Sequence, residues 1–396
     1  MSLPEDFQLR EFAPLCLSVE RIGPFQNRLE EIDFTTIEGE PCNAFLLLSQ
    51  NGRGKTTVLE LIKALVALLG QDALSQFDYE PLNSGSGRAQ LDLRVKSIVA
   101  GRTETAVLSL IAGDIGESTY LKPWLEEDLK RVGAEIWRQH GFRRRSIGDL
   151  QQVGSLLDPW LRNFNTWIAE RMGTRLSTFE GDPLTLPTLI LLSAYRDIVP
   201  IKQSELRAIS EPADWNYRTI HSFQIEGGSW RESLDNLLVW LKWLDDGRFE
   251  RAVSLINTRV FSGDTKFLKG VKKDPPEAVI VSDDQEHRLD KLSSGEKSLV
   301  QMFLRIGTHM TKNTILLIDE VDVHLHPAWR ERTLGQLKAM IAEFFPGLTV
   351  IATTHSMEIM AGFAHDVPEP NLRKGVRVLE TEEEELRAHE VSKGSE

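Results

Sequence analysis

Residues 49–57 combine two glycines, a lysine and two threonines, which are residue types that bind phosphate groups. Gly52 and Gly54 let the backbone turn without a Cβ atom in the way, so that successive N–H groups can point at phosphate oxygens. Lys55 can reach the β- and γ-phosphates of a nucleotide, and the hydroxyl of Thr56 can bind Mg²⁺. The segment fits the pattern G-x-x-x-x-G-K-(S/T) except at its first position, Ser49. The residues that we expect at the nucleotide are Asn51, Gly52, Arg53, Gly54, Lys55, Thr56 and Thr57.

A phosphate-binding loop needs a strand before it and a helix after it. Residues 44–48 are all apolar, as in a buried strand, and residues 58–69 carry apolar side chains at helical spacing. Such a helix directs the positive end of its dipole at the phosphates. The alternative is a glycine-rich turn that carries a lysine and a threonine by chance, and three motifs later in the chain disfavour it.

The first of these motifs is a pair of carboxylates, Asp319 and Glu320, directly after the apolar residues 315–318. An apolar run of this length predicts a buried parallel strand, and open α/β sheets bind ligands at the carboxyl ends of such strands. Asp319 is placed to hold Mg²⁺, directly or through water, and Glu320 to activate a water molecule against the γ-phosphate. The alternative is a buried strand that ends in two solvated acids.

Two further polar segments precede a helix or follow a strand. Ser293, Ser294 and Gly295 come before apolar residues at helical spacing, so they predict a helix N-terminus that offers a hydroxyl and several N–H groups to an anion. A plain helix cap is the alternative. Residues 349–354 predict another buried strand, and His355 follows directly after it. We expect His355 to hydrogen-bond the γ-phosphate or the attacking water, and a structural histidine is the alternative.

The other segments predict an α/β chain. Residues 118–180 are predicted to be mainly helical, with tryptophans packed between the helices. Residues 230–257 predict a second helical stretch. Residues 15–19 and 31–34 are predicted to be strands of an edge sheet, and residues 90–97 and 103–111 a hairpin. Further strands are predicted at residues 43–48, 186–193, 267–271 and 277–281.

Composition and charge limit the function. The net charge of −13 argues against a protein that wraps nucleic acid, although a local basic patch such as Arg143 to Arg145 stays open. No apolar run approaches the roughly 18 residues that span a bilayer. Cys16 and Cys42 fit buried, reduced thiols. Together with the absence of an apolar signal-like segment near Met1, these features predict a cytoplasmic protein without a membrane partner.

The four motifs together resemble those of the ABC-class ATPases. They are the phosphate loop, Leu-Ser-Ser-Gly-Glu at 292–296, Ile-Leu-Leu-Ile-Asp-Glu at 315–320 and Thr-Thr-His-Ser at 353–356. The Leu-His-Pro run at 325–327 is similar to that of the SMC-like and OLD-like AAA-family ATPases, which accompany effector proteins in bacterial anti-phage systems. The resemblance covers residues from about 15 to 380 and implies an α/β fold, an ABC-type ATPase head with a P-loop mixed sheet, an antiparallel edge sheet and helical insertions.

The resemblance also implies a division of the chain. We expect an N-terminal lobe with the phosphate loop at residues 1–113, a helical insertion at 114–184 and a C-terminal lobe at 185–380. The C-terminal lobe contains the signature, the acid pair and the histidine. Residues 381–396 are expected to form an acidic, flexible tail.

The resemblance implies ATP hydrolysis with ATP and Mg²⁺ as cofactors. Ser293 and Gly295 match the signature that closes over the γ-phosphate of the opposite subunit, and Asp322 falls where a family loop crosses the dimer interface. The chain is therefore expected to form a head-to-head dimer or a higher homo-oligomer. The segment Arg21 to Phe25 lies where relatives contact the nucleotide, and Tyr195-Arg196 lies where a glutamine loop senses Mg²⁺.

These observations predict an ATPase that dimerises around Mg-ATP and controls a separate effector, a nuclease or toxin, in antiviral defence. About 40 residues follow His355, fewer than a nuclease domain needs, so we expect the effector to be another chain. One alternative is a RecF- or SMC-like ATPase that binds DNA in repair or recombination through a basic groove. Another is the ATPase subunit of a membrane transporter, which the Leu-His-Pro run disfavours.

Overall fold

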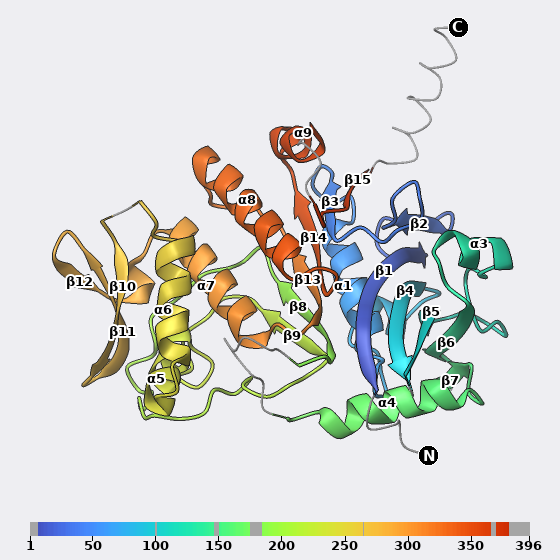
Figure 1. The fold of residues 1–396 in the computed structure, drawn as a ribbon, viewed down its shortest axis with the longest axis horizontal. Coiled ribbons are helices and arrows are strands. Elements are labelled where there is room, and N and C mark those ends of the chain that lie inside the picture. Colours follow the sequence, from blue (N-terminus) through green and yellow to red (C-terminus); the bar gives the residue numbers. More distant parts are fainter. Residues whose placement is uncertain are drawn as a thin grey trace, which may run out of the picture. The chain divides into compact units, whose positions relative to one another are not determined.

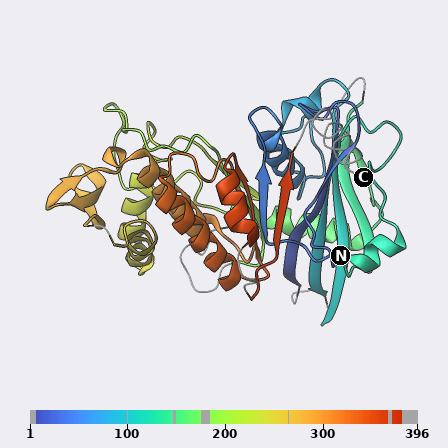
Figure 2. The same ribbon diagram turned by 90° about the horizontal axis from the view of Figure 1, so that it is seen from above.

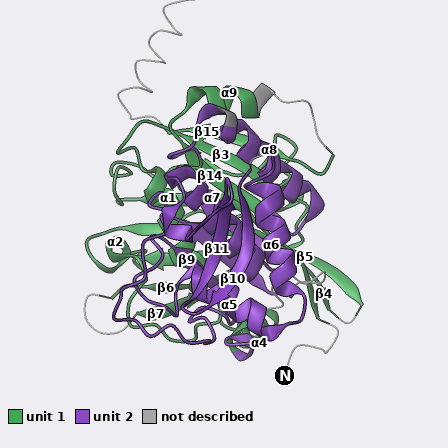
Figure 3. Ribbon diagram, turned by 90° about the vertical axis from the view of Figure 1, so that its left-hand side faces the viewer, with its two compact units in different colours: residues 1–169, 319–321, 349–396 green, residues 170–318, 322–348 purple. Residues whose placement is uncertain are grey.

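The computed structural model describes residues 7–99, 101–145, 150–174, 184–263, 265–365 and 370–379. Two compact units are coloured separately in Figure 3. Unit 1 comprises Met1–Ala169, Asp319–Val321 and Thr349–Glu396, and unit 2 comprises Glu170–Ile318 and Asp322–Leu348. The acid pair therefore belongs to the same unit as the phosphate loop, although the chain on both sides of it belongs to unit 2.

A mixed sheet with the strand order β2-β1-β4-β5-β6-β7 forms a large part of unit 1. Its strands, blue to teal in Figures 1 and 2, are β1 (Gln8–Glu20), β2 (Glu30–Asp33), β4 (Arg88–Val99), β5 (Arg102–Gly113), β6 (Ile136–Arg143) and β7 (Gln151–Gly154). β5 and β6 run parallel, and the other neighbours run antiparallel. The predicted hairpin is confirmed as β4 and β5, and Gly101 lies between them with a φ of 73°. β1, predicted in an edge sheet, lies between β2 and β4.

The prediction that residues 118–180 are mainly helical is wrong. Only α3 (Glu126–Arg131) and α4 (Pro159–Arg171) are helices in the described part of this stretch, and between them β6 and β7 extend the mixed sheet. The reason is pairing with a distant strand: the indole of Trp137 on β6 donates a hydrogen bond to Ser109 on β5, and a Cβ at Gly141 would lie 2.1 Å from the carbonyl oxygen of Ile111. The lobe boundaries at residues 113, 184 and 380 stay a prediction.

A parallel arrangement of strands carries the phosphate loop in unit 1. β3 (Ala44–Leu48) pairs with β14 (Leu348–Thr354) and with β15 (Lys374–Val378). Leu48 lies opposite Thr354, so Ser49 and His355 leave the sheet at the same edge. α1 (Lys55–Val66) follows the loop and buries the apolar side that its sequence predicts. Unit 1 also contains α2 (Glu80–Asn83) and α9 (Met357–His365), besides α3 and most of α4.

Unit 2 contains a parallel group of strands, an antiparallel sheet and several helices. β13 (Asn313–Ile318) and β9 (Ile220–Phe223) both pair in parallel with β8 (Pro187–Leu192). The antiparallel sheet consists of β10 (Phe267–Lys273), β11 (Pro276–Ser282) and β12 (Gln285–His287). The helical elements are α5 (Leu234–Leu244), α6 (Arg248–Arg259), η1 (Leu289–Lys291), α7 (Ser294–His309) and α8 (Pro327–Glu343).

The predicted α/β class is confirmed, as are the strands expected at residues 186–193, 267–271 and 277–281 and the helices expected within 230–257. The predicted buried thiols are also confirmed, because Cys16 and Cys42 are buried and form no disulfide. The predicted tail at residues 381–396 lies outside the described residues. Within the described ranges, no helix has both the length and the apolar character needed to cross a membrane.

Asp92 is a fully buried carboxylate in the mixed sheet, and burial raises its pKa to about 6. An unfolded aspartate has a pKa of about 3.9, so at pH 7 the cost of ionising Asp92 favours unfolding, and this cost disappears below about pH 4. We expect Asp92→Asn to raise the free energy of unfolding by roughly 1–3 kcal/mol at pH 7, with no gain at pH 4. Urea unfolding at the two pH values measures the difference.

The exposed Asp78 provides a matched control, because Asp78→Asn is expected to change stability by less than about 0.5 kcal/mol at either pH. An equal effect of Asp92→Asn at pH 4 and pH 7 would show that the buried charge is not its cause.

Candidate nucleotide site

The loop between β3 and α1 has the backbone that a phosphate-binding loop needs. Gly52 and Gly54 have φ values of 77° and 98°, in the left-handed region that favours glycine. Gly54 is also required for space, since a Cβ there would lie 2.7 Å from Pro24 Cγ and 2.8 Å from Phe25 Cζ. The segment expected to contact the nucleotide, Arg21 to Phe25, therefore packs against this loop.

The side chain of Lys55 is buried within the loop that precedes it. Its Nζ atom donates to the carbonyl oxygens of Ser49, at 2.7 Å, and of Gln50, at 3.1 Å. The Ser49 hydroxyl lies 3.2 Å from the same ammonium group. Ser49, which stands where the motif has a glycine, thus offers two oxygens to Lys55.

Asp319 and Thr56 form the pair of oxygen ligands that the sequence predicts for Mg²⁺. The hydroxyl of Thr56 donates to Asp319 Oδ2 at 2.9 Å, and Asp319 is buried. A carboxylate and a hydroxyl suit Mg²⁺, which usually keeps several water ligands and binds to few protein groups. Among the residues that the structure describes, no cluster of three or more His, Cys, Asp or Glu side chains could hold a metal by itself. The carboxylate of Asp319 and the hydroxyl of Thr56 are therefore a donor pair that fits Mg²⁺.

Glu320 and His355 are in direct contact. His355 Nε2 lies 2.8 Å from Glu320 Oε1, and because an ionised carboxylate only accepts hydrogen bonds, Nε2 is the donor. The other ring nitrogen, Nδ1, lies 3.2 Å from Lys55 Nζ and 3.0 Å from the Ser49 carbonyl oxygen. The histidine thus connects the phosphate loop to the acid pair.

The backbone of Glu320 is strained, with a φ of 47° in a region that residues with a side chain rarely adopt. Its N–H group donates to the hydroxyl of Thr353 at 2.7 Å. That hydroxyl in turn donates to Asp319 Oδ1 at 2.7 Å. Sequence reasoning assigned no function to Thr353, and the available signal was its place in the Thr-Thr-His-Ser run at residues 353–356.

The predicted signature residues lie at the start of α7 in unit 2. Ser293 and Glu296 form a capping box: Glu296 accepts from the Ser293 N–H at 2.8 Å and from its hydroxyl at 2.6 Å. Ser293 and Ser294 are exposed, whereas Gly295 is buried. A Cβ at Gly295 would lie 2.9 Å from the carbonyl oxygen of His324, so this glycine allows the segment of Asp322 to approach the helix.

The segment that follows β8 also contacts the start of α7. Arg196 donates to the Ser298 hydroxyl at 2.8 Å, and Lys297 forms an ion pair with Asp197 at 3.0 Å. Tyr195-Arg196, the segment expected to sense Mg²⁺, is therefore connected to the signature helix within unit 2. The site residues are divided between the units: Lys55, Thr56, Asp319, Glu320 and His355 belong to unit 1, and Ser293, Ser294, Gly295 and Asp322 belong to unit 2.

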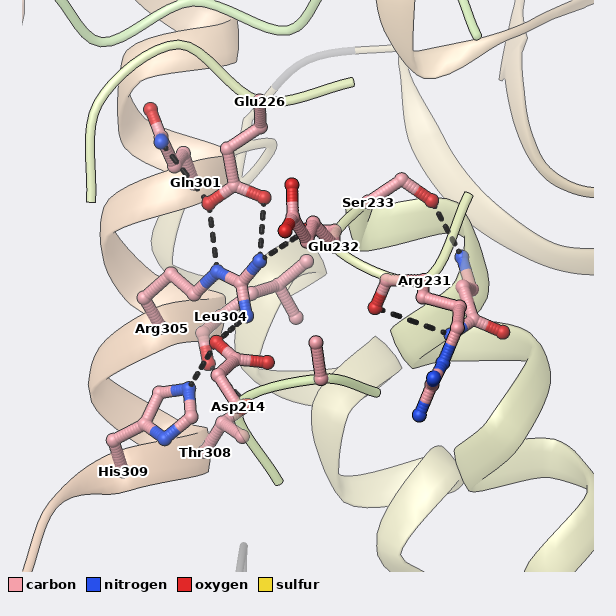
Figure 4. Close-up of polar contacts among 12 residues, drawn as sticks. Asp214, Glu226, Arg231, Glu232, Ser233, Gln301, Leu304, Arg305, Thr308 and His309 are labelled. Atoms are coloured by element: carbon pink, nitrogen blue, oxygen red, sulfur yellow. Dashed lines mark hydrogen bonds and ion pairs between the residues drawn. The ribbon is translucent and has the colours of Figure 1, made fainter. Parts of the chain in front are cut away.

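Further along α7, a buried ionic network connects the helix to two segments, one before β9 and one after it (Figure 4). The guanidinium group of Arg305 donates to both carboxylate oxygens of Glu226 at 2.6 Å and to Asp214 at 2.7 Å. Burial alone would raise the pKa of Asp214, but the charge of Arg305 and the interactions with His309 together outweigh burial and hold this pKa well below its usual range. His309 Nε2 lies 3.2 Å from the same carboxylate.

The basic run at residues 143–145 bonds to its own neighbours. Arg143 and Arg145 both donate to the side-chain oxygen of Gln151, and Arg144 lies 3.6 Å from Asp114. Arg145 is exposed, and Gln151 is a neutral acceptor, so a DNA-binding patch at this run stays a prediction.

Residues 190–361 match a protein family described as "AAA domain, putative AbiEii toxin, Type IV TA system". The matched range contains the acid pair and His355, and it begins after the phosphate loop. Among solved structures, the chain is similar to "Dimeric structure of a post-hydrolysis state of the ATP-binding cassette MJ0796 bound to ADP and Pi", with 11% identity, a TM-score of 0.28 and coverage of 87% of this chain and 89% of that chain.

Three curated proteins are similar to parts of the chain. "Retron Ec83 probable ATPase" of Escherichia coli is 31% identical over 80 residues, which is 17% of this chain and 14% of that protein. "Septu protein PtuA" of Bacillus thuringiensis is 30% identical over 110 residues, covering 24% and 27%. "Retron Vc95 probable ATPase" of Vibrio cholerae serotype O1 biovar El Tor is 28% identical over 109 residues, covering 25% and 20%. The matches thus span between a seventh and about a quarter of these relatives.

Proposed function

We propose that the protein binds and hydrolyses ATP with Mg²⁺, starting from the match of residues 190–361 to a family described as an AAA domain. The observation that carries the proposal is the grouping of Lys55, Thr56, Asp319, Glu320 and His355 within unit 1. These are the side chains that phosphoryl transfer to water requires: a phosphate-binding cation, ligands for Mg²⁺ and a carboxylate near the γ-phosphate. The similarity to two proteins named as retron ATPases supports the same activity.

Each residue has a defined task in this reaction. The loop N–H groups and Lys55 bind the β- and γ-phosphates, and Thr56 and Asp319 would hold Mg²⁺. When bound, the metal neutralises charge that develops on the phosphate oxygens. Glu320 accepts a proton from the attacking water, and His355 orients Glu320 through the 2.8 Å contact of its Nε2 atom.

We further propose that two subunits close head to head around ATP. The signature residues Ser293 and Ser294 are exposed at the start of a helix, where the N–H groups of the first turn and the Ser294 hydroxyl can meet an anion brought by another subunit. Asp322 accompanies them in the same unit. The motion of the dimer would control a separate effector protein in antiviral defence, as the similarity to retron and Septu proteins supports.

A substitution at the signature tests the dimer. We expect Ser293→Arg to lower ATP turnover by roughly 10- to 100-fold, because a large cation at the helix start blocks its approach to a second subunit's nucleotide. Affinity for ATP should stay within about threefold, since the phosphate loop is unchanged. Phosphate release and light scattering after size exclusion, with and without Mg-ATP, measure the two effects.

Ser204→Arg is the matched control, because it places the same side chain at an exposed serine of unit 2 far along the sequence from the signature. A Ser293→Arg protein that hydrolyses ATP as fast as the control contradicts the proposed dimer. A gain in DNA affinity on adding ATP that falls steeply with salt would instead favour the DNA-binding alternative.

A further inference from the structure

The hydroxyl group of Thr353 lies between the two acidic residues of the site. Thr353 is the sixth residue of β14, and its side chain has no exposed surface. The hydroxyl donates to Asp319 Oδ1 at 2.7 Å and accepts from the N–H of Glu320 at 2.7 Å. A hydroxyl has one hydrogen to donate, so these two contacts assign its donor to the carboxylate and one of its lone pairs to the amide.

The contacts of Thr353 determine how both acids are held. Asp319 has one oxygen bonded to Thr353 and the other bonded to Thr56, so its carboxylate is fixed at both ends. Glu320 has a left-handed backbone with a φ of 47°, and such a conformation persists only where the surroundings hold it. The bond from the Glu320 N–H to Thr353 provides that support, and the carbonyl of Thr353 also accepts from Val321 at 2.9 Å.

We propose that Thr353 is a positioning residue of the ATPase, whose single hydroxyl sets both the Mg²⁺-binding carboxylate of Asp319 and the backbone from which Glu320 reaches its water. This inference rests on the proposed function of the site. It assigns Thr353 an effect on rate and on metal-dependent binding, and no direct contact with ATP.

The alternative is that Thr353 is only a good strand former, since β-branched residues favour buried strands. Valine has the same branching and nearly the same shape but no hydroxyl, so Thr353→Val keeps the strand preference and removes both hydrogen bonds. Thr353→Ser does the reverse, because it keeps the hydroxyl and loses a methyl group. The pair of substitutions therefore separates the two explanations.

We expect Thr353→Val to lower kcat by roughly 10- to 100-fold while KM for ATP changes by less than about threefold, because the hydrogen bonds it removes act on the acids and not on the phosphate loop. Thr353→Ser should return kcat to within about threefold of the wild type. Thr349→Val is the matched control: Thr349 is a buried threonine of the same strand and the same side, about 13 Å away along the strand.

A binding measurement provides a readout that does not depend on turnover. The probe is the non-hydrolysable analogue adenylyl imidodiphosphate, titrated by calorimetry in Mg²⁺ and in EDTA. We expect Thr353→Val to bind it like the wild type in EDTA and to lose about two- to threefold of the gain in affinity that Mg²⁺ gives, because the Asp319 carboxylate is no longer fixed. The Thr349→Val protein should keep the full gain.

The outcomes distinguish this inference from the proposed function. A wild-type protein that neither binds the analogue nor releases phosphate contradicts the ATPase itself. If the wild type is active and Thr353→Val has the same kcat and the same gain in affinity on adding Mg²⁺, only the positioning of the acids by Thr353 is overturned. If Thr353→Val does not fold, as judged by circular dichroism, hydrogen exchange of the wild type decides: slow exchange at the Glu320 amide supports the bond, and fast exchange overturns it.

Discussion

Replacing Glu320 by glutamine is expected to lower ATP turnover by roughly 10²- to 10⁴-fold and to leave ATP binding intact. The glutamine amide cannot accept a proton from water, whereas the loop residues that we propose to bind phosphate, above all Lys55, are unchanged. Its side chain is close in size and keeps an oxygen that can accept from His355 Nε2, which lies 2.8 Å from Glu320 Oε1. The substitution thus removes the base and retains the geometry around it.

The same protein should accumulate as the closed dimer on Mg-ATP, because hydrolysis no longer reopens it. Phosphate release measures the first effect, and size exclusion with light scattering measures the second. Glu358→Gln is the control, since Glu358 is an exposed glutamate of unit 1 on α9. A Glu320→Gln enzyme that turns over ATP at the wild-type rate would remove Glu320 from the reaction.

The second large effect is expected on stability, at the buried ionic network of α7. Arg305→Met leaves Glu226 and Asp214 without their cationic partner, and removing one side of a buried ion pair typically costs about 3–5 kcal/mol. Methionine has a similar length and introduces no polar group. We therefore expect a loss of this size in the free energy of unfolding at pH 7, measured by urea denaturation.

The dependence on pH follows from the carboxylate of Asp214. Because Arg305, together with His309, holds the pKa of Asp214 below its usual range against the effect of burial, the stabilisation is present above about pH 4 and is lost as the pH falls further. The cost of Arg305→Met should accordingly shrink in acid. Glu250→Gln is the matched control, since it breaks the exposed pair with Lys242 and should cost less than about 0.5 kcal/mol. A loss as small as that of the control would show that the network does not stabilise unit 2.

The candidate site was largely predictable because its chemistry is encoded locally. A phosphate loop needs glycines at fixed positions before a helix, and an acid pair after a buried strand is visible in a few consecutive residues. Thr353 was not predictable in the same way, because its two bonds join residues more than thirty positions away in the sequence. A threonine in a strand has an ordinary structural explanation until those partners are known.

The fold was predictable where the pattern of one segment determines its structure, and it was missed where a distant strand decides. β3, β13 and β14 are buried throughout, so their apolar runs were sufficient. The stretch that contains β6 carries polar and aromatic residues without a clear alternation, and it becomes a strand by pairing with β5. Sequence spacing alone contains no information on that pairing.

The short segment Asp319–Val321 has a consequence for how this protein can be dissected. It belongs to unit 1 but enters from Ile318 and leaves through Asp322, which both belong to unit 2. Unit 1 is assembled from three stretches of chain and unit 2 from two, so no single cleavage site releases either unit whole. A truncation that ends at Ala169 would deprive the phosphate loop of β14, β15 and the acid pair together. Because the chain passes back and forth between the two units, the role of either unit is best studied by substitutions in the full chain.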